Sequence, residues 1–344
     1  MRPTTLTIVI GAGASYDCVS QGRSDIDLDY RPPLTNDIFA SRRSFNGVLH
    51  KYQKVEALTD EIRTKLARGL SIEQLLREFA DERIFVLRKN YFEIPFYLQE
   101  LLGEISFHYV RTGSTKFATL FRMILRSEFK QVLLITLNYD LFLEKAITAL
   151  TGHTFVNLSS YFPTDQKWML LKLHGSVLWG RPLLNSPAVG STTGVLDALN
   201  EEPSLAAEIR VLRGHQDEQR TAGGLFHFPC LAVPLDRKKQ FACPTEQVEK
   251  AREFIRDCAA FLILGYSGLD LDVLELLGVA REVRAVKVVD ESKEGGLQVL
   301  KRIAAANPLF GQIPPVNLGD AISERGFEQF MSSGESERFF DLPI

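Results

Sequence analysis

Several short polar segments of this sequence combine residue types that suit nucleotide or sugar chemistry. The first is Gly11-Ala12-Gly13-Ala14-Ser15, which directly follows the apolar run of residues 6–10. Glycine lets a backbone turn tightly and approach a phosphate closely, and the first amides of a following helix attract anions. The full G-x-G-x-x-G pattern is missing because Tyr16 stands at its last position. We interpret the segment as a nucleotide-binding turn, and a strand-to-helix turn that binds nothing is the alternative.

Two further segments place an amide and an imidazole directly after apolar runs. In Thr136-Leu137-Asn138-Tyr139-Asp140, the Asn138 carboxamide offers both an acceptor and donors. Asp140 is equally suited to cap the next helix. In Lys172-Leu173-His174-Gly175-Ser176, His174 can take a proton near neutral pH or bond a ribose hydroxyl. A lone histidine can also be purely structural. These segments therefore indicate a functional site only when they are taken together.

Two more candidates follow later apolar runs. Gly265-Tyr266-Ser267-Gly268 suits contact with ribose or phosphate oxygens. Its alternative is a turn in which Asp270 or Asp272 caps the next helix. Asp290 ends another apolar run, where a carboxylate can bind an adenosine ribose diol or cap a helix.

The elements that must position these residues alternate between strand and helix. Nearly all-apolar runs predict strands that are buried on both faces. These runs are 6–10, 131–140, 168–176, 227–234, 260–267 and 284–290. The sequence therefore predicts an α/β fold, a Rossmann-like doubly wound parallel sheet. Because parallel strands end at one edge of a sheet, the polar segments are expected to meet there.

Two insertions interrupt this alternation. Residues 40–126 show helical spacing, as in Ile72, Leu75 and Leu76, and predict a helical insertion subdomain. Residues 180–224 are rich in Gly, Pro, Ser and Thr and predict a loop-rich insertion. We assign residues 1–315 to one domain and residues 316–344 to a weakly patterned C-terminal tail.

Composition excludes several classes of protein. The formal net charge of −3 provides no positive field for nucleic acid, so no strong direct nucleic-acid binding is expected. The 4 cysteines form no Cys-x-x-Cys pair, which predicts no zinc module and no metal. No apolar run reaches the ~18 residues of a membrane span. We expect a soluble cytoplasmic protein with free thiols.

The polar segments, taken in order, resemble the motifs of the sirtuin (silent information regulator) family. That family carries Gly-Ala-Gly-x-Ser, Thr-x-Asn-x-Asp, a catalytic His-Gly and a late Gly-x-Ser, which match residues 11–15, 136–140, 174–175 and 265–267. The longer segment LGYSGLDLDV is most similar to the bacterial sirtuin-like branch. The resemblance implies a Rossmann-type domain that binds NAD and breaks its nicotinamide–ribose bond.

The resemblance also implies roles for individual residues. Gly11, Ala12, Gly13 and Ser15 would hold the phosphates, and Asn138 and Asp140 would line the nicotinamide-ribose pocket. His174 would act as base on a ribose hydroxyl or on the attacking water. The predicted catalytic residues are Asn138 and His174, and the predicted NAD-binding residues are Gly11, Ala12, Gly13, Ser15, Thr136, Asp140, Gly265, Ser267 and Asp290.

The sequence departs from deacylating sirtuins in several ways, one of which is the large helical insertion where that family keeps a short cofactor loop. It has no four-cysteine zinc module, and residues 31–40 read RPPLTNDIFA where that family continues Gly-Ile-Pro-Asp-Phe-Arg. With no evident site for an acyl-lysine peptide, water is the simplest nucleophile and the products would be nicotinamide and ADP-ribose. Sirtuin-like proteins of this kind resemble NAD-depleting effectors of bacterial antiphage defence, which act by abortive infection. The resemblance implies a homo-oligomer and a partner ATPase, DNA translocase or sensor protein.

Three other functions stay open on the sequence alone. The same site would serve an NAD-dependent protein deacylase or ADP-ribosyltransferase. A non-catalytic module that senses NAD or ADP-ribose would bind without turnover, although such a module would have no need for both Asn138 and His174. A dehydrogenase is conceivable from the glycine segment, but it leaves the later motifs unexplained.

Overall fold

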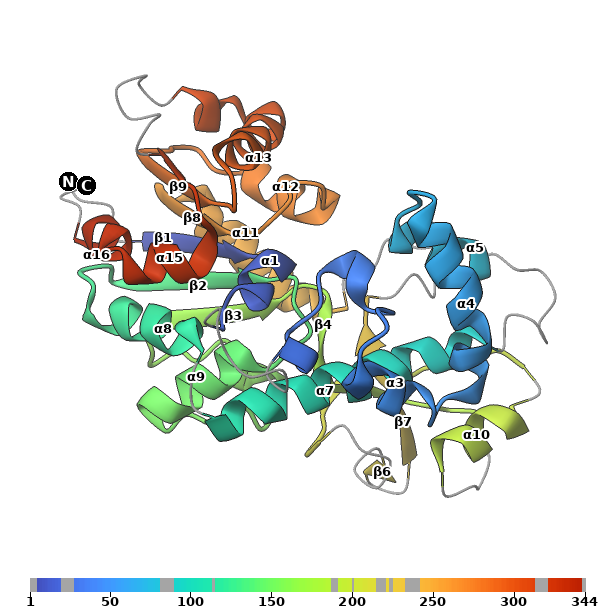
Figure 1. Ribbon diagram of the computed structural model, residues 1–344. Coiled ribbons are helices and arrows are strands. Elements are labelled where there is room, and N and C mark those ends of the chain that lie inside the picture. The colour runs from blue at the N-terminus through green and yellow to red at the C-terminus, as the bar shows by residue number, and fades with distance from the viewer. Residues whose placement is uncertain are drawn as a thin grey trace.

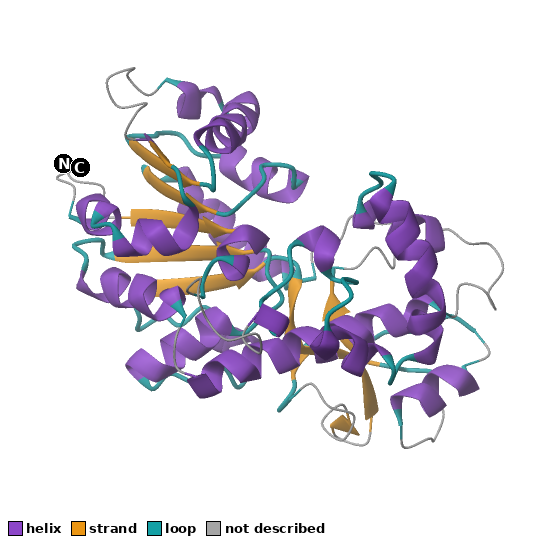
Figure 2. Ribbon diagram, in the orientation of Figure 1, coloured by secondary structure: helices purple, strands orange, loops and turns teal. Residues whose placement is uncertain are grey.

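A six-stranded parallel sheet is the largest element of the computed structural model (Figures 1 and 2). The strands are β1 (Thr5–Ile10), β2 (Gln131–Thr136), β3 (Trp168–Lys172), β8 (Ala260–Leu264), β9 (Ala285–Val289) and β10 (Ile322–Ser323). The structure describes residues 5–19, 28–80, 90–112, 115–186, 191–199, 201–214, 221–222, 225–232, 242–312 and 321–341 of the chain.

The strand order confirms the predicted fold class. The order is β10-β9-β8-β1-β2-β3, and each neighbouring pair is parallel. If these strands are renumbered along the chain, the order becomes 3-2-1-4-5-6, which is typical of Rossmann dinucleotide-binding folds. The direction of winding reverses between β1 and β8. In open α/β sheets, ligands bind beyond the carboxyl ends of the strands at such a reversal.

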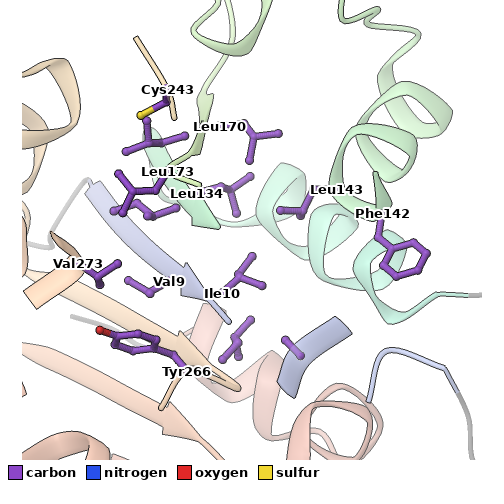
Figure 3. Close-up of a cluster of buried hydrophobic side chains, with 14 of the residues drawn as sticks. Val9, Ile10, Leu134, Phe142, Leu143, Leu170, Leu173, Cys243, Tyr266 and Val273 are labelled. Carbon is purple, nitrogen blue, oxygen red and sulfur yellow. The ribbon is translucent and has the colours of Figure 1, made fainter. Parts of the chain in front are cut away.

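The central strands are apolar because helices cover both faces of the sheet. In β1, Leu6, Ile8, Val9 and Ile10 are fully buried, and β2 and β8 are buried in the same way. Figure 3 shows Val9 and Ile10 in one cluster with Leu134, Tyr266 and Val273, whose side chains come from segments far apart in the sequence.

Two groups of helices cover the sheet. The first comprises α1 (Ala12–Tyr16), α8 (Lys116–Arg126), α9 (Phe142–Thr151), α15 (Gly326–Ser332) and α16 (Glu335–Phe340). In this group α8 packs against α9, α15 and α16, and α1 packs against α15. The second comprises α11 (Thr245–Arg256), α12 (Leu271–Gly278) and α13 (Lys293–Ala306), in which α12 contacts both of the others. Helix α8 buries Phe117, Leu120, Phe121 and Ile124 at helical spacing.

The two insertions, expected as separate features, pack together into one unit beside the main sheet (Figure 1). The helical insertion supplies α3 (Arg43–Leu49), α4 (Gln53–Ala67), α5 (Ile72–Ala80), α7 (Ile94–Thr112) and the short helix η2 (Tyr91–Glu93), and the short helix η1 (Thr35–Asp37) precedes it. An antiparallel sheet in the order β5-β4-β7-β6 contains β4 (Gly175–Pro182), β5 (Arg210–Val211), β6 (Thr221–Ala222) and β7 (Leu225–Leu231). Helix α10 (Thr192–Ala198) contacts η2.

Helix α7 connects the helical part of this unit to its antiparallel sheet. Its Phe96 ring packs edge-on against Phe228 of β7, with ring centroids 4.8 Å apart, and the Gln99 amide donates to the Val177 carbonyl of β4 at 2.9 Å. The run that predicts a strand at residues 227–234 therefore contributes β7 to the smaller antiparallel sheet, not to the parallel one. Helix α8, also inside the expected insertion, packs with the main sheet's helices instead.

Residues 321–341, within the expected tail, carry regular structure. Strand β10 pairs with β9 at the edge of the main sheet, and α15 and α16 follow. The division between residues 1–315 and 316–344 stays a prediction. The short helices η3 (Leu158–Tyr161) and η5 (Pro308–Gly311) complete the described elements. No helix in the described ranges combines the length and apolar character that crossing a bilayer requires.

Candidate active site

Backbone hydrogen bonds continue past the carboxyl ends of the parallel strands. They bring the five predicted polar segments to one edge of the sheet. The bonds run from Gly11 N to Leu264 O (3.0 Å), Leu137 N to Ile10 O (3.1 Å), Leu173 N to Thr136 O (3.1 Å), Gly265 N to Val289 O (3.0 Å) and Asp290 N to Ser323 O (3.0 Å).

The glycines after β1 and β8 pack against each other. Gly13 N donates to Gly265 O at 3.1 Å. A Cβ on Gly11 would lie 2.5 Å from Gly265 O, and a Cβ on Gly265 would lie 2.1 Å from Ala14 N. Gly265 also has φ +54°, in the left-handed region. The contact between the two loops thus requires glycine at these positions, whether or not a nucleotide binds beside them.

We predict that Gly265→Ala destabilises the fold, by roughly 1–3 kcal/mol from the new clash with backbone atoms and the positive φ. The matched control is Gly47→Ala within α3, where an added Cβ meets nothing within 4 Å. There alanine should stabilise by about 0.5–1 kcal/mol through helix propensity. Urea unfolding of both variants measures the difference. Equal stabilities would contradict the packing argument.

A buried polar network connects the glycine loop to the segment after β2. Ser15 Oγ donates to Asp140 Oδ2 at 2.6 Å. Asn138 Nδ2 donates to Gly11 O at 2.9 Å and to Ser15 Oγ at 2.7 Å. Asn138 N donates to Thr136 Oγ1 at 3.1 Å. Both amide hydrogens of Asn138 are thereby used. Its Oδ1 has no hydrogen-bond partner in the part of the chain that the structure describes, so it is the acceptor that this network leaves open.

A buried ion pair of Lys172 and Glu144 contacts the backbone of the segment after β2. Lys172 Nζ lies 2.9 Å from Glu144 Oε1 and also donates to the carbonyls of Tyr139 (3.4 Å) and Asp140. Burial raises the pKa of Asp140, although the Lys172 charge, the Ser15 hydroxyl and the Phe142 amide all act to lower it. Asp140 Oδ1 accepts from the amide of Phe142, the first residue of α9, at 3.2 Å, although the N-cap position of that helix is Leu141.

His174 lies in the turn between β3 and β4, at the same sheet edge. Its Nε2 is 2.9 Å from Asp270 Oδ2, and both side chains are about one-fifth exposed, at 23% and 22%. The Tyr139 ring lies beside the imidazole, with centroids 6.4 Å apart. Gly175 has φ +90°, and a Cβ there would lie 2.0 Å from Cys230 O. The sharp turn after the histidine therefore requires glycine.

Ser267 and Asp290 lie at the edge but outside the Ser15–Asn138–Asp140 network. Ser267 is exposed, and its carbonyl accepts from Arg302 Nη1 at 2.5 Å. Asp290 Oδ1 accepts from Ser292 N at 3.1 Å, but the residue that caps α13 is Ser292, whose hydroxyl accepts from Gly295 N at 3.0 Å. No described residue bonds Asp290 Oδ2, which therefore stays available for a ligand hydroxyl. Their predicted contacts with NAD stay predictions.

Two interactions of this site escaped the sequence interpretation. The sequence allows Asp270 as a helix cap, and it does cap α12 through Val273 N at 2.9 Å, but its second oxygen pairs with His174. The buried pair Lys172–Glu144 had no sequence signal except a charged residue at the end of an apolar strand. Within the described residues, no three His, Cys, Asp or Glu side chains are grouped to hold a metal ion.

Comparisons with known proteins find similarity in shape alone. No family model matches the sequence, and no curated protein matches it. One similar solved structure is a mutant Sir2 homologue in complex with 2'-O-acetyl ADP ribose, with 12% identity and a TM-score of 0.43 over 99% of this chain and 95% of that one. Another is a Sir2 homologue–NAD complex, with 11% identity and a TM-score of 0.39 over 90% and 91%. The fold assignment rests on this chain's own strand order.

Proposed function

We propose that the protein is an NAD glycohydrolase, in which water replaces nicotinamide on the ribose and yields nicotinamide, ADP-ribose and a proton. The observation that carries the proposal is the state of Asn138. Its two amide hydrogens are fixed on Gly11 and Ser15, and its Oδ1 stays open at the sheet edge that also bears His174. An acceptor held in this way can orient a ribose hydroxyl or a water molecule.

The residues present fit a sugar more directly than a phosphate. Asn138 Oδ1 and Asp290 Oδ2 are acceptors without a described partner, and ribose hydroxyls donate to such atoms. The Gly13 amide and the Ser15 hydroxyl already donate within the protein. The predicted phosphate contacts of these two groups would require them to leave their present partners. The position of the glycine loop at the β1–β8 reversal supports a dinucleotide nearby.

Hydrolysis of NAD requires a general base but no general acid. The leaving nicotinamide of NAD is already cationic in the substrate and departs neutral, so no general acid is needed. A base must take a proton from water as it attacks the ribose. His174 is partly exposed and can pass that proton to solvent. Such base catalysis contributes typically about 10²–10⁴-fold.

The proposal includes a cellular role that rests on the sequence resemblance. An enzyme that depletes NAD would kill its own cell, so its activity must be restrained until a trigger arrives. We propose an effector of abortive infection in antiphage defence, activated by oligomerisation or by a partner ATPase or sensor protein. The motifs at residues 11–15, 136–140 and 174–175 support this extension.

The test is to incubate the purified protein with NAD and quantify nicotinamide and ADP-ribose by chromatography. We expect both products without any peptide, either from the protein alone at a concentration at which it oligomerises or after a partner ATPase or sensor protein is added, and their loss in His174→Ala. The control is His50→Ala, since the His50 side chain is 68% exposed and pairs with Glu56. Nicotinamide release that requires an acylated peptide or a protein acceptor would identify a deacylase or ADP-ribosyltransferase. Binding of NAD without release, also in the presence of the partner, would identify a sensor.

A further inference from the structure

The pairing of His174 with Asp270 determines which imidazole nitrogen is available. His174 Nε2 lies 2.9 Å from Asp270 Oδ2. An ionised carboxylate only accepts hydrogen bonds, so Nε2 must carry a proton. A neutral imidazole then has its lone pair on Nδ1. Nδ1 has no hydrogen-bond partner in the described ranges and is not among their fully buried, unpartnered atoms.

The structure holds Asp270 firmly in this position. Its Oδ1 accepts from Val273 N at 2.9 Å as the cap of α12, and its carbonyl accepts from the Tyr266 hydroxyl at 2.9 Å. Burial acts to raise the pKa of Asp270, but the hydrogen bond and charge of His174 and the amides of Val273 and Asp272 outweigh it, and the pKa is lowered. The carboxylate therefore stays ionised and keeps its second oxygen for the imidazole.

We propose that Asp270 is a positioning residue that fixes His174 with its proton on Nε2, so that Nδ1 is the atom that accepts the proton from water. This inference rests on the proposed hydrolysis. As water attacks the ribose, its proton moves to Nδ1, and the resulting imidazolium keeps its Nε2–H bond to the Asp270 carboxylate. Asp270 itself is not protonated at any step. The proton later leaves Nδ1 for solvent, which restores the neutral imidazole.

Asp270→Asn separates this role from helix capping. Asparagine caps a helix about as well as aspartate and has nearly the same size. With its oxygen retained on Val273 N, the new amide would present N–H to His174 Nε2. The imidazole would then carry its proton on Nδ1, where it can no longer accept one. We expect kcat to fall by about 10²–10⁴-fold with little change in KM.

The second measurement is the tautomer itself, by ¹⁵N NMR of protein labelled at histidine. The chain has 6 histidines, and the His174 signals are those that disappear in His174→Ala. At a pH where the ring is neutral, we expect an unprotonated Nδ1 in the wild type and a protonated Nδ1 in Asp270→Asn. Asp272→Asn removes the same charge from the first turn of the same helix and should change neither the rate nor the spectrum.

Three results would overturn the inference. A wild-type spectrum with a protonated Nδ1 would contradict the tautomer, and unchanged kcat in Asp270→Asn would contradict the positioning role. Faster turnover in Asp270→Asn would mean that the pair restrains His174. The tautomer is read without NAD. A protein that fails to hydrolyse NAD both alone and after activation would therefore refute the proposed function, while the spectrum still decides how Asp270 holds His174.

Discussion

Asn138→Ala is expected to lower the rate of NAD hydrolysis by at least about 10²-fold, the scale on which misplaced reacting groups reduce catalysis. The variant removes the open Oδ1 acceptor, and it also removes the two donations that hold Gly11 O and Ser15 Oγ. Nicotinamide release at saturating NAD measures the effect, with a thermal melt to establish that the variant is folded.

Asn138→Asp makes the same test without changing the size of the side chain. A carboxylate can accept from a ribose hydroxyl but cannot donate to Gly11 O and Ser15 Oγ. It would also introduce a second negative charge close to buried Asp140, since both residues bond Ser15. We expect it to be as inactive as Asn138→Ala. Full hydrolysis by the folded alanine variant would show that Asn138 is not part of the site.

The sequence predicts the strands that are buried on both faces, because their composition reflects that burial directly. The predicted runs 6–10, 131–140 and 260–267 correspond to the strands β1, β2 and β8, although the last two runs extend several residues past the strand ends. Knowing that parallel strands end together was then enough to gather Gly11, Asn138 and His174 at one edge. The prediction succeeded for these strands because a short continuous apolar run is typical of a strand that is buried on both faces.

Pairings between distant segments were not predictable from the sequence. Phe228 lies in an apolar run that fits a parallel strand equally well, and only its packing on Phe96 and pairing with β4 place it in the antiparallel sheet. Strand β10 has two residues, Ile322 and Ser323, too few for any periodic signal. Asp270 is an ordinary helix cap in sequence, and only the fold brings its free oxygen to His174.

The glycines show how one residue type can satisfy two explanations. The pattern Gly11-Ala12-Gly13 predicts a phosphate-binding turn, yet the contact with Gly265 already requires glycine at position 11 and leaves a Cβ at position 13 only 3.0 Å from Gly265 O. Their presence is therefore weaker evidence for a nucleotide than the sequence alone suggests. The evidence lies instead with polar atoms that have no partner, above all Asn138 Oδ1, and these cannot be identified without the structure.

Lys172→Met is expected to lower the free energy of unfolding by about 3–5 kcal/mol, because it leaves a buried carboxylate without its counter-charge. The side chains of Lys172 and Glu144 are only 1% and 4% exposed, and their charged atoms lie 2.9 Å apart. Glu144 Oε2 already lacks a hydrogen-bond partner within the described residues. Urea unfolding at neutral pH measures the loss, and Lys250→Met on the exposed side of α11 should stay within about 0.5 kcal/mol of wild type.

The loss in free energy of unfolding caused by Lys172→Met should become smaller as the pH falls. Burial raises the pKa of Glu144 in the wild type, and the Lys172 charge and hydrogen bond oppose that rise. Without Lys172 the pKa of Glu144 rises further. At a pH between the pKa of Glu144 in the unfolded chain and its higher pKa in the folded variant, the folded protein binds more protons than the unfolded chain. The stability of the variant therefore increases as the pH decreases through that range. A deficit that grows in mild acid would contradict this account.

A double variant separates the cost of the unpaired charge from the role of Lys172 at the site. Lys172→Met with Glu144→Leu removes both charges, and replacing a buried pair by apolar side chains is often neutral or stabilising. We expect most of the lost stability to return. We expect NAD hydrolysis to be low both in Lys172→Met and in the double variant, because Lys172 Nζ also holds the Tyr139 and Asp140 carbonyls that follow Asn138. Normal hydrolysis by the double variant would mean that Lys172 serves only to neutralise Glu144. The Ser15–Asn138–Asp140 network would then keep its geometry without the hydrogen bonds from Lys172 Nζ.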